Sequence, residues 1–489
     1  MKMKINTLKN RIIFTLVAFI AISCSDDFVD VTSENESADN YFNSEEEYQQ
    51  ALIGAYDLLQ ATYLNVLIGE IASDNTLAGG ESANDVIGLQ EIDKMNHTPV
   101  NQQLRDVWNW MFAGVNRANY ILQFQDKTDF EGRSEVIAQA RFLRAYYYFE
   151  LVKFFGDVPL FVDKPLEFGE QFNIARTPRS EVYDQIEADL IFAAENLPAT
   201  QAQEGRITSG AANALLGKAY LYQEQFTEAA ASFEKVISGP YMLVQDYESI
   251  FEPEGQNGPG SVFEIQYSDK EGAGFGCLQC SEGNVAVGFN GIRNFNGPIF
   301  DSGFSFNLPV QEVVDAFTED DIRKDVAILD IDEFASNTGA TFVEGFEHTG
   351  YYNRKYLARQ GDLNTGDANL TNPNNYRSIR FADVLLMAAE ANFKKSSPDL
   401  GKATEYLNRV RVRAELDPVT LVGNELLDQI YKDRRLELVG EGHRFFDLVR
   451  TGRAASEIDG FVSGKHELFP IPAIEIQLAG NNWEQNPNY

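Results

Sequence analysis

Ionisable side chains are densest between Asn424 and Arg453, near the C-terminal end of the chain. Glu437, His443 and Asp447 are residue types that general acid–base catalysis uses. The same stretch also carries Arg434, Arg435, Glu441, Arg444 and Arg450. Because these charges alternate with apolar residues at helical spacing, we expect them to be partly buried and therefore paired. Arginines outnumber the acid–base candidates and no nucleophile lies close by, so we predict ion pairs between two C-terminal helices and no catalytic residues.

Cys277 and Cys280 form a C-x-x-C motif with no second pair and no nearby histidine, so a zinc site is not expected. Outside the cytoplasm, two such cysteines form a disulfide that pins a loop tip. Further along, Asp362, Asn364 and Asp367 resemble a calcium loop but miss the EF-hand spacing. We predict a disulfide, no cofactor and no metal site, with a structural calcium ion as an open alternative.

Two long segments, 73–102 and 244–376, lack helical periodicity, and irregular segments of this length are usually functional. Neither contains a tryptophan, so an apolar platform there must come from Phe or Tyr. Aromatic rings stack on the apolar faces of sugars, while amide and Arg side chains bond the hydroxyls. The candidate carbohydrate-binding residues are Asn75, Asn96, His97, Phe289, Arg293, Asn294, Phe295 and Tyr351. Phe295 and Tyr351 are the first choices for the platform, and a turn or loop-core role stays open for every candidate.

The composition is strongly acidic, with 74 Asp and Glu against 40 Lys and Arg. Residues 1–23 hold four bases and no acid, so their removal leaves 36 bases against 74 acids and a net charge of about −38. Such a surface repels nucleic acid and anionic lipid and favours neutral or cationic partners. Any attachment to a membrane must then be covalent or through a protein partner.

The N-terminus suggests a covalent attachment. Basic residues precede the apolar run Ile12–Ile22, which is too short to span a bilayer and has the proportions of a secretory signal. The run ends in Ala21-Ile22-Ser23-Cys24, which resembles a lipoprotein signal in which Cys24 becomes lipidated. We expect residues 1–23 to be a signal peptide and the polar residues 24–43 to be a flexible tether. An ordinary secretory peptide is the alternative.

Apolar residues recur at helical spacing across 44–243 and 377–489. Residues 212–241 reproduce most of the tetratricopeptide spacing, and residues 381–414 form a looser copy. One such hairpin cannot cover its own apolar face, so several must stack.

We therefore predict a mainly α fold in a single domain, 44–489. Tetratricopeptide-like helical hairpins form its superhelical scaffold, and a loop-rich ligand-binding region is inserted at about 244–376.

Three runs of residues carry a family resemblance. They are Arg434 to Glu437 with Glu441-Gly442-His443-Arg444-Phe445-Phe446-Asp447-Leu448 and Gly452; Ala140 to Phe149 with Phe154-Phe155-Gly156-Asp157-Val158-Pro159; and Leu468 to Pro472 with Gln485 to Tyr489. The chain resembles the SusD/RagB family of outer-membrane nutrient-binding lipoproteins along nearly its whole mature length.

The resemblance implies a SusD-like fold anchored through Cys24 to the outer face of the outer membrane. It also implies capture of an oligo- or polysaccharide and delivery to a SusC-like TonB-dependent transporter. The acidic charge argues against anionic glycans, so a neutral glucan is preferred. Peptide capture, as in RagB-like members, is the alternative within binding proteins. A surface glycoside hydrolase and a repeat scaffold that binds only protein are alternatives from other classes, although no nucleophile motif indicates an enzyme.

Overall fold

The computed structural model describes residues 40–167, 169–272, 274–361 and 369–489. The predicted signal peptide and lipidation site Cys24 lie outside the described residues. So do Asp362, Asn364 and Asp367, and the calcium alternative therefore stays a prediction.

Helix α2 (Glu45–Asp57) is the first long element, and its N-terminus is capped by Ser44, whose hydroxyl accepts from the Glu47 backbone N–H at 3.4 Å. Phe42 lies within the range predicted to be a tether, yet it is fully buried between the rings of Tyr48 (4.7 Å) and Phe124 (5.3 Å). Core packing therefore begins two residues before Ser44.

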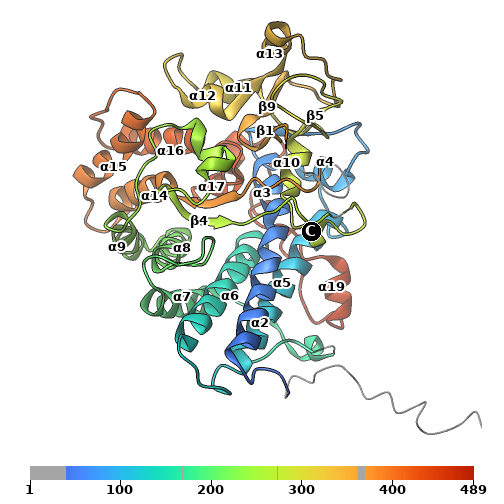
Figure 1. Cartoon of the computed structure of the whole chain (residues 1–489), viewed down its shortest axis with the longest axis vertical. Helices are drawn as coiled ribbons and strands as arrows, with labels where there is room; N and C mark the ends of the chain where they lie inside the picture. The colour runs from blue at the N-terminus through green and yellow to red at the C-terminus, as the bar shows by residue number, and fades with distance from the viewer. Residues whose placement is uncertain (1–39, 168, 273, 362–368) are drawn as a thin grey trace, which may run out of the picture.

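Long helices that pack against one another make up most of the molecule. The 3₁₀ turn η3 (Leu58–Thr62) follows α2. The other helices of this group are α3 (Tyr63–Ile71), α5 (Gln102–Gln123), α6 (Arg133–Phe155), α7 (Arg179–Asn196), α8 (Ser209–Tyr222), α9 (Phe226–Ile237), α14 (Phe381–Lys394), α15 (Leu400–Arg413), α16 (Asn424–Leu438) and α17 (Arg444–Arg450). They occupy the lower and left parts of Figure 1. The prediction of a mainly α fold is confirmed.

The predicted repeat 212–241 coincides with the hairpin α8–α9, and its looser copy coincides with α14–α15. A Cβ at Gly217 would lie 2.5 Å from the ring of Phe233, which is fully buried. A glycine on α8 therefore makes room for a large ring on α9, as the spacing predicts. The tetratricopeptide-like character of the whole stack stays a prediction.

The loop-rich region forms the upper part of Figure 1, and its described residues form two-stranded sheets and short helices. The strand pairs of the protein are β1 (Thr76–Gly79) with β7 (Phe306–Pro309), β2 (Val158–Pro159) with β3 (Arg176–Thr177), β4 (Ser261–Ile265) with β10 (Tyr376–Arg380), β5 (Ile292–Arg293) with β6 (Ser302–Gly303), and β8 (Ile328–Asp330) with β9 (Tyr351–Asn353). The short helices are α4 (Ile87–Asp93), α10 (Val285–Asn290), α11 (Gln311–Asp315), α12 (Arg323–Ala327), α13 (Ile331–Thr338), α18 (Ala454–Glu457) and α19 (Ala473–Leu478), with the 3₁₀ turns η4 (Glu170–Asn173), η5 (Glu248–Phe251), η6 (Pro253–Gly255), η7 (Leu278–Cys280) and η8 (Arg354–Tyr356).

One large core runs through the stacked helices, and a smaller core lies beneath the loops of the upper part, around Phe295, Phe300 and Tyr352. By length and composition, Glu45–Ile71 could cross a membrane, but 67% of its apolar window is buried inside the protein. This segment is therefore explained as core helix.

Candidate functional site

The acid–base candidates near the C-terminus lie inside an ion-pair network. Glu437 is buried and accepts hydrogen bonds from Arg380 (2.8 Å) and Arg413 (2.6 Å). Burial alone would raise the pKa of Glu437, but the charges of these arginines hold it below its usual range. Burial lowers the pKa of His443, which therefore stays neutral. Arg434 of α16 (Asn424–Leu438) donates to Asp447 of α17 (Arg444–Arg450) at 2.7 Å, so the prediction of ion pairs between two C-terminal helices is confirmed.

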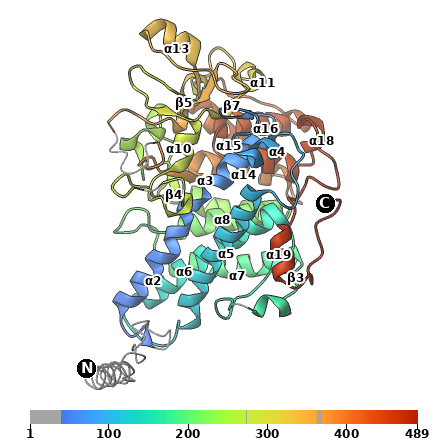
Figure 2. The same ribbon diagram turned by 90° about the vertical axis from the view of Figure 1, so that its right-hand side faces the viewer.

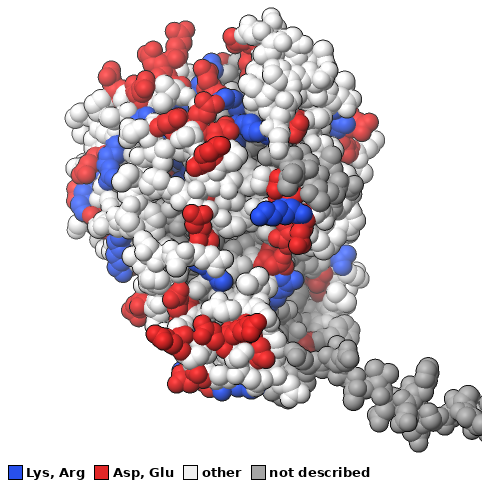
Figure 3. Space-filling model, in the orientation of Figure 1, with Lys and Arg blue, Asp and Glu red and all other residues white. Residues whose placement is uncertain are grey.

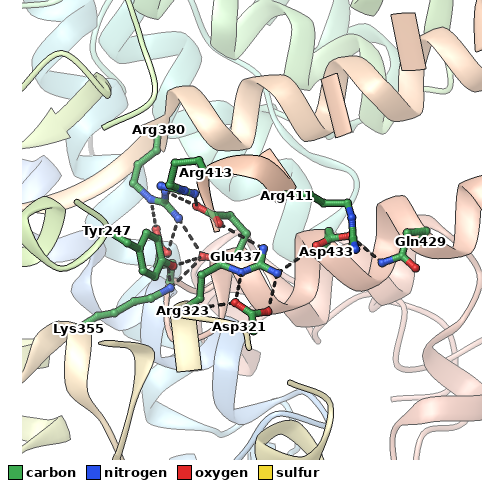
Figure 4. A network of polar contacts seen from close by, with 11 residues as sticks. Tyr247, Asp321, Arg323, Lys355, Arg380, Arg411, Arg413, Gln429, Asp433 and Glu437 are labelled. Carbon is green, nitrogen blue, oxygen red and sulfur yellow. Dashed lines mark hydrogen bonds and ion pairs between the residues drawn. The ribbon is translucent and has the colours of Figure 1, made fainter. Parts of the chain in front are cut away.

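Part of this network comes from the loop-rich region, as Figure 4 shows. Arg323 is fully buried and donates to Asp321 (2.8 and 2.7 Å) and to Asp433 of α16 (3.0 Å). Lys355 donates to Glu441 at 2.7 Å. The ion pairs therefore fasten the loop-rich region to α16, in addition to joining two helices. The local sequence around Arg323 and Lys355 gives no sign of this role.

The two irregular segments meet in one surface. Strand β1, from residues 73–102, pairs antiparallel with β7, from residues 244–376, with Gly79 opposite Phe306. Ser305, just before β7, is fully buried and joins the segments: its carbonyl accepts from the Gly80 N–H at 2.7 Å, and its hydroxyl accepts from the Arg293 N–H at 2.9 Å. We call the exposed surface made by 80–87, 291–305 and 341–349 the junction face.

The junction face itself carries Arg293 and several acidic residues, among them the exposed Glu81 and Glu344, whereas the surface above it is largely uncharged. In Figure 3 acidic side chains spread over much of the view, whereas the top, where Figure 1 places α13 and β5, is mostly white. In Figure 2, α10 and α4 lie below β5 and above α5, so these helices border the face. A surface of this kind suits a ligand without net charge.

Backbone strain is concentrated at the junction face. Val86 (φ 43°) and Ile299 (φ 73°) adopt left-handed conformations that β-branched residues rarely take. Asn294 (φ 47°) and Ser305 (φ 59°) are also left-handed. Such strain persists where the surrounding structure enforces it, often at ligand sites. Ile299 is 52% exposed, so burial of its side chain does not explain its conformation.

Arg293 is the main cation of the junction face. Its Nη2 donates to the Phe304 carbonyl at 3.0 Å. The carboxylates of Glu81 and Asp85 each lie 3.6 Å from the guanidinium, which is too far for a good hydrogen bond. The charge of Arg293 is thus compensated, and its Nη1, which is not enclosed and forms no hydrogen bond among the described residues, is able to donate to a ligand hydroxyl.

Five aromatic rings run from α5 to the tip of a loop, and we call them the aromatic ridge. They are Trp110, Tyr63, Phe289, Phe304 and Phe275, with successive ring centroids 6.0, 6.3, 6.1 and 5.6 Å apart. Tyr63 and Phe289 are buried, Trp110 and Phe304 are partly exposed, and Phe275 is 60% exposed. Buried rings thus support exposed ones, which is what a stacking platform requires.

The loop that carries Phe275 is closed by a disulfide between Cys277 and Cys280. Its short turn η7 packs on η3, at the start of the scaffold. The disulfide restricts residues 277–280, which begin two residues after Phe275.

Sequence reasoning left both a packing role and a ligand-platform role open for Trp110 and did not single out Tyr63; both residues lie on helices and not in the irregular segments. Trp110 flanks the apolar stripe through Val107 and Met111, and a tryptophan at the edge of such a stripe was the available signal. Tyr63 has a hydroxyl with no hydrogen-bond partner among the residues that the structure describes.

The predicted site residues divide between this surface and the interior. Phe289 belongs to the aromatic ridge, Arg293 lies at the junction face, and Asn294 is exposed beside it. Phe295 is only 8% exposed and packs between Phe300 and Phe334, so it supports the face from below.

The other candidates lie apart from the aromatic ridge. Asn75 is buried and its amide oxygen accepts from Arg435 at 2.8 Å. His97 is buried with Nε2 2.8 Å from the Tyr489 hydroxyl, and burial lowers its pKa to about 3. The Tyr351 hydroxyl donates to Gln311 at 3.0 Å. Asn96 is exposed after α4. We leave these four residues out of the proposed site.

A groove of about 710 Å³ lies on the other side of β1, between the end of α4 and residues 456–460. It is lined by carboxylates, among them Asp93 and Glu347. Burial, followed by the negative charge of Glu347, raises the pKa of Asp93 to about 7. An acidic groove of this kind is ill suited to an anionic ligand.

Known proteins resemble both halves of the chain. Residues 329–467 match the model of the SusD family, and residues 27–221 match a model described as starch-binding and associating with the outer membrane. SusD-like protein P2 of Formosa agariphila is 26% identical over 98% of this chain and 100% of its own length. The starch-binding protein SusD of Bacteroides thetaiotaomicron is 23% identical over 86% of this chain and 84% of its own length.

Solved structures agree with this assignment. A laminarin-binding SusD-like protein is 34% identical and superposes with a TM-score of 0.83, covering 92% of this chain and 100% of that one. Surface glycan-binding protein A from Bacteroides thetaiotaomicron, solved in complex with laminarihexaose, is 28% identical, with a TM-score of 0.80 and coverage of 91% and 100%.

Proposed function

The chain belongs to the SusD-like family of glycan-binding proteins associated with the outer membrane, and from this we propose that it captures a neutral oligo- or polysaccharide on the aromatic ridge and the junction face. The observation that carries the proposal is the ridge itself. Exposed rings backed by buried ones lie beside Arg293, whose Nη1 forms no hydrogen bond among the described residues, and this combination matches the apolar faces and hydroxyls of a sugar chain.

A neutral glucan is the preferred ligand class. The charge of Arg293 is compensated by two carboxylates, and the sequence has a net charge of −34. An anionic glycan would be repelled by this charge. The names of two structural relatives mention laminarin or laminarihexaose, which are neutral glucans, and these names support the same preference.

The captured glycan would then pass to a SusC-like TonB-dependent transporter, with the protein held on the cell surface by a lipid on Cys24. The family resemblance supports both steps. The positions of the N-terminal helix and of the proposed binding surface are compatible with both steps. Helix α2 begins at the lower end of the molecule in Figures 1 and 2, whereas β5 and the junction face lie at the upper end. A protein tethered ahead of α2 would hold this face away from its anchor.

The test compares ridge variants with a matched control. Phe275→Ala and Trp110→Ala should each weaken binding of laminarihexaose by about 5- to 30-fold, or about 1–2 kcal/mol, because each removes a stacking ring. The control is Phe172→Ala, which removes a ring of similar exposure (47%) from η4, away from the ridge. Isothermal titration calorimetry measures affinity. Melting should be unchanged in Phe275→Ala, because that ring is mostly in solvent.

The same titration distinguishes the alternatives. Equal affinities for Phe275→Ala, Trp110→Ala and Phe172→Ala would remove the ridge from the site. Binding of a peptide mixture, with no response to laminarihexaose, maltohexaose or an alginate oligosaccharide, would favour RagB-like peptide capture. If the repurified protein still released shorter sugars, and the Asp93→Asn variant did not, the result would favour a hydrolase that uses the acidic groove.

A further inference from the structure

A second groove lies on the helical scaffold and is formed by elements other than those of the aromatic ridge and the junction face. Its volume is about 640 Å³, within the range of small-molecule sites. It lies between the C-terminal half of α6, the start of α7, the turn from α8 to α9, and α17. The side chains used below are Tyr183, Tyr222, Gln223, Gln225, Phe446 and Arg179, all of which line it.

Two tyrosines of this groove have hydroxyls without a partner. Tyr183 is only 6% exposed, and Tyr222 is partly buried. Both rings pack near Phe149, at centroid distances of 6.5 and 5.1 Å. Neither hydroxyl forms a hydrogen bond with any residue that the structure describes. Neither hydroxyl oxygen is enclosed, so both open into the groove and are able to bond a ligand there.

The hydroxyls keep their protons at any physiological pH, because burial raises the pKa of Tyr183 and Tyr222 above the usual value. Each can therefore donate one hydrogen bond and accept others, as a sugar hydroxyl does.

The walls supply further polar groups and no strong excess of charge. Gln223 and Gln225 add amide groups at the turn after α8. Lys153 is paired with Glu150 at 2.7 Å, and Arg450 is paired with Glu390 at 2.8 Å, so neither is an uncompensated cation. Arg179, Glu224 and Glu467 also line the groove, so its charged lining residues are three cations and two carboxylates. This balance favours a neutral ligand.

We propose that this groove is a second glycan-binding site, which we call the scaffold groove, and that it takes a short stretch of a neutral saccharide between its aromatic floor and its amide rim. The inference rests on the proposed glycan-binding function and adds a second point of contact to it. Two weak sites on one protein can hold a polysaccharide more tightly than either alone, provided that one chain can reach both.

The two sites can be separated by titrating the purified full chain with laminarihexaose and with maltohexaose. Wild-type protein should bind two molecules of one of these probes. The ridge double variant Trp110→Ala with Phe275→Ala should retain one weak site. Adding Tyr183→Phe and Tyr222→Phe to that variant should weaken the residual binding about tenfold or more, because only the two hydroxyls are lost.

Tyr406→Phe is the matched control, since it deletes a hydroxyl that bonds Glu234 outside the groove. It should leave the residual site unchanged, and circular dichroism should show every variant folded. One bound molecule in wild type with no residual binding in the ridge variant would overturn the scaffold groove and leave the ridge in place. Residual binding that Tyr183→Phe and Tyr222→Phe do not weaken would also overturn it. Absence of any glycan binding in wild type would refute the proposed function and this inference together.

Discussion

Replacement of Arg323 by Ala should destabilise the protein strongly without touching the proposed glycan site. Arg323 is fully buried on α12, and its guanidinium bonds Asp321, Asp433 and Glu437. It therefore joins the loop-rich region to α16 from the inside (Figure 4).

The expected loss of stability depends on which cationic partners each carboxylate keeps after Arg323 is replaced. Glu437 retains Arg380 (2.8 Å) and Arg413 (2.6 Å), and Asp433 retains Arg411 (3.0 Å). For Asp321, the structure records no other cationic partner among the residues that it describes. Leaving one buried carboxylate unpaired costs about 3–5 kcal/mol.

Repulsion among the cations of the network places the expected loss of stability at the low end of this range. Five cationic side chains, including Lys355, face four carboxylates in the wild-type network, so removal of one cation also relieves repulsion among the arginines. We therefore expect a loss of about 3 kcal/mol in the free energy of unfolding.

Urea denaturation measures this loss as a lower midpoint at an unchanged m value. The control is Arg354→Ala, which removes a cation of the same region that pairs with Glu248 near the surface, and it should cost about 1 kcal/mol or less. Laminarihexaose affinity of the folded fraction should be the same in both variants. A loss of less than 1 kcal/mol for Arg323→Ala would refute the pairing argument. Normal stability with lost binding would place the network in the ligand site.

Three further changes are expected. The pKa of Asp93 is about 7 in the folded protein against a reference value of 3.8, so the native state holds a proton that the unfolded state releases, and stability falls as pH rises through this window. Asp93→Asn should therefore raise the melting temperature at pH 8 and leave it unchanged at pH 4, and equal shifts at both would contradict the assignment. Cys24→Ala should release unlipidated protein into the periplasm or medium, and unchanged surface display in protease shaving of whole cells would count against the anchor. Without reductant, Cys277 and Cys280 should resist alkylation in mass spectrometry, and detection of two free thiols would exclude the disulfide.

The sequence by itself determined the helical scaffold and the family, because both depend on local patterns. Periodic apolar residues predicted a helical scaffold across 44–243 and 377–489, where the long helices lie, since a helix is stabilised by side chains three and four positions apart. The glycine–phenylalanine pairing of Gly217 with Phe233 was likewise implicit in the repeat spacing. The density of opposite charges near Glu437 was enough to predict ion pairs, since unpaired charges do not stay buried.

The tertiary structure alone decided which side chains reach solvent. Phe295 and Phe275 belong to the same irregular segment, yet the first is 8% exposed beside Phe300 and the second is 60% exposed at a loop tip. Trp110 lies on a scaffold helix but belongs to the aromatic ridge, because Tyr63 of α3 packs beside it and α3 packs against α10. Exposure depends on neighbours that are distant in the chain, and no local periodicity records them.

The same reason explains the junction face and the network of Figure 4. The pairing of β1 with β7 joins residues more than 200 positions apart, and Arg323 reaches Glu437 across 114 positions. Local spacing could show that two irregular segments and a charged helix were present. Only the folded chain brings the two segments together into one surface and supplies the buried cation that fastens it to the scaffold.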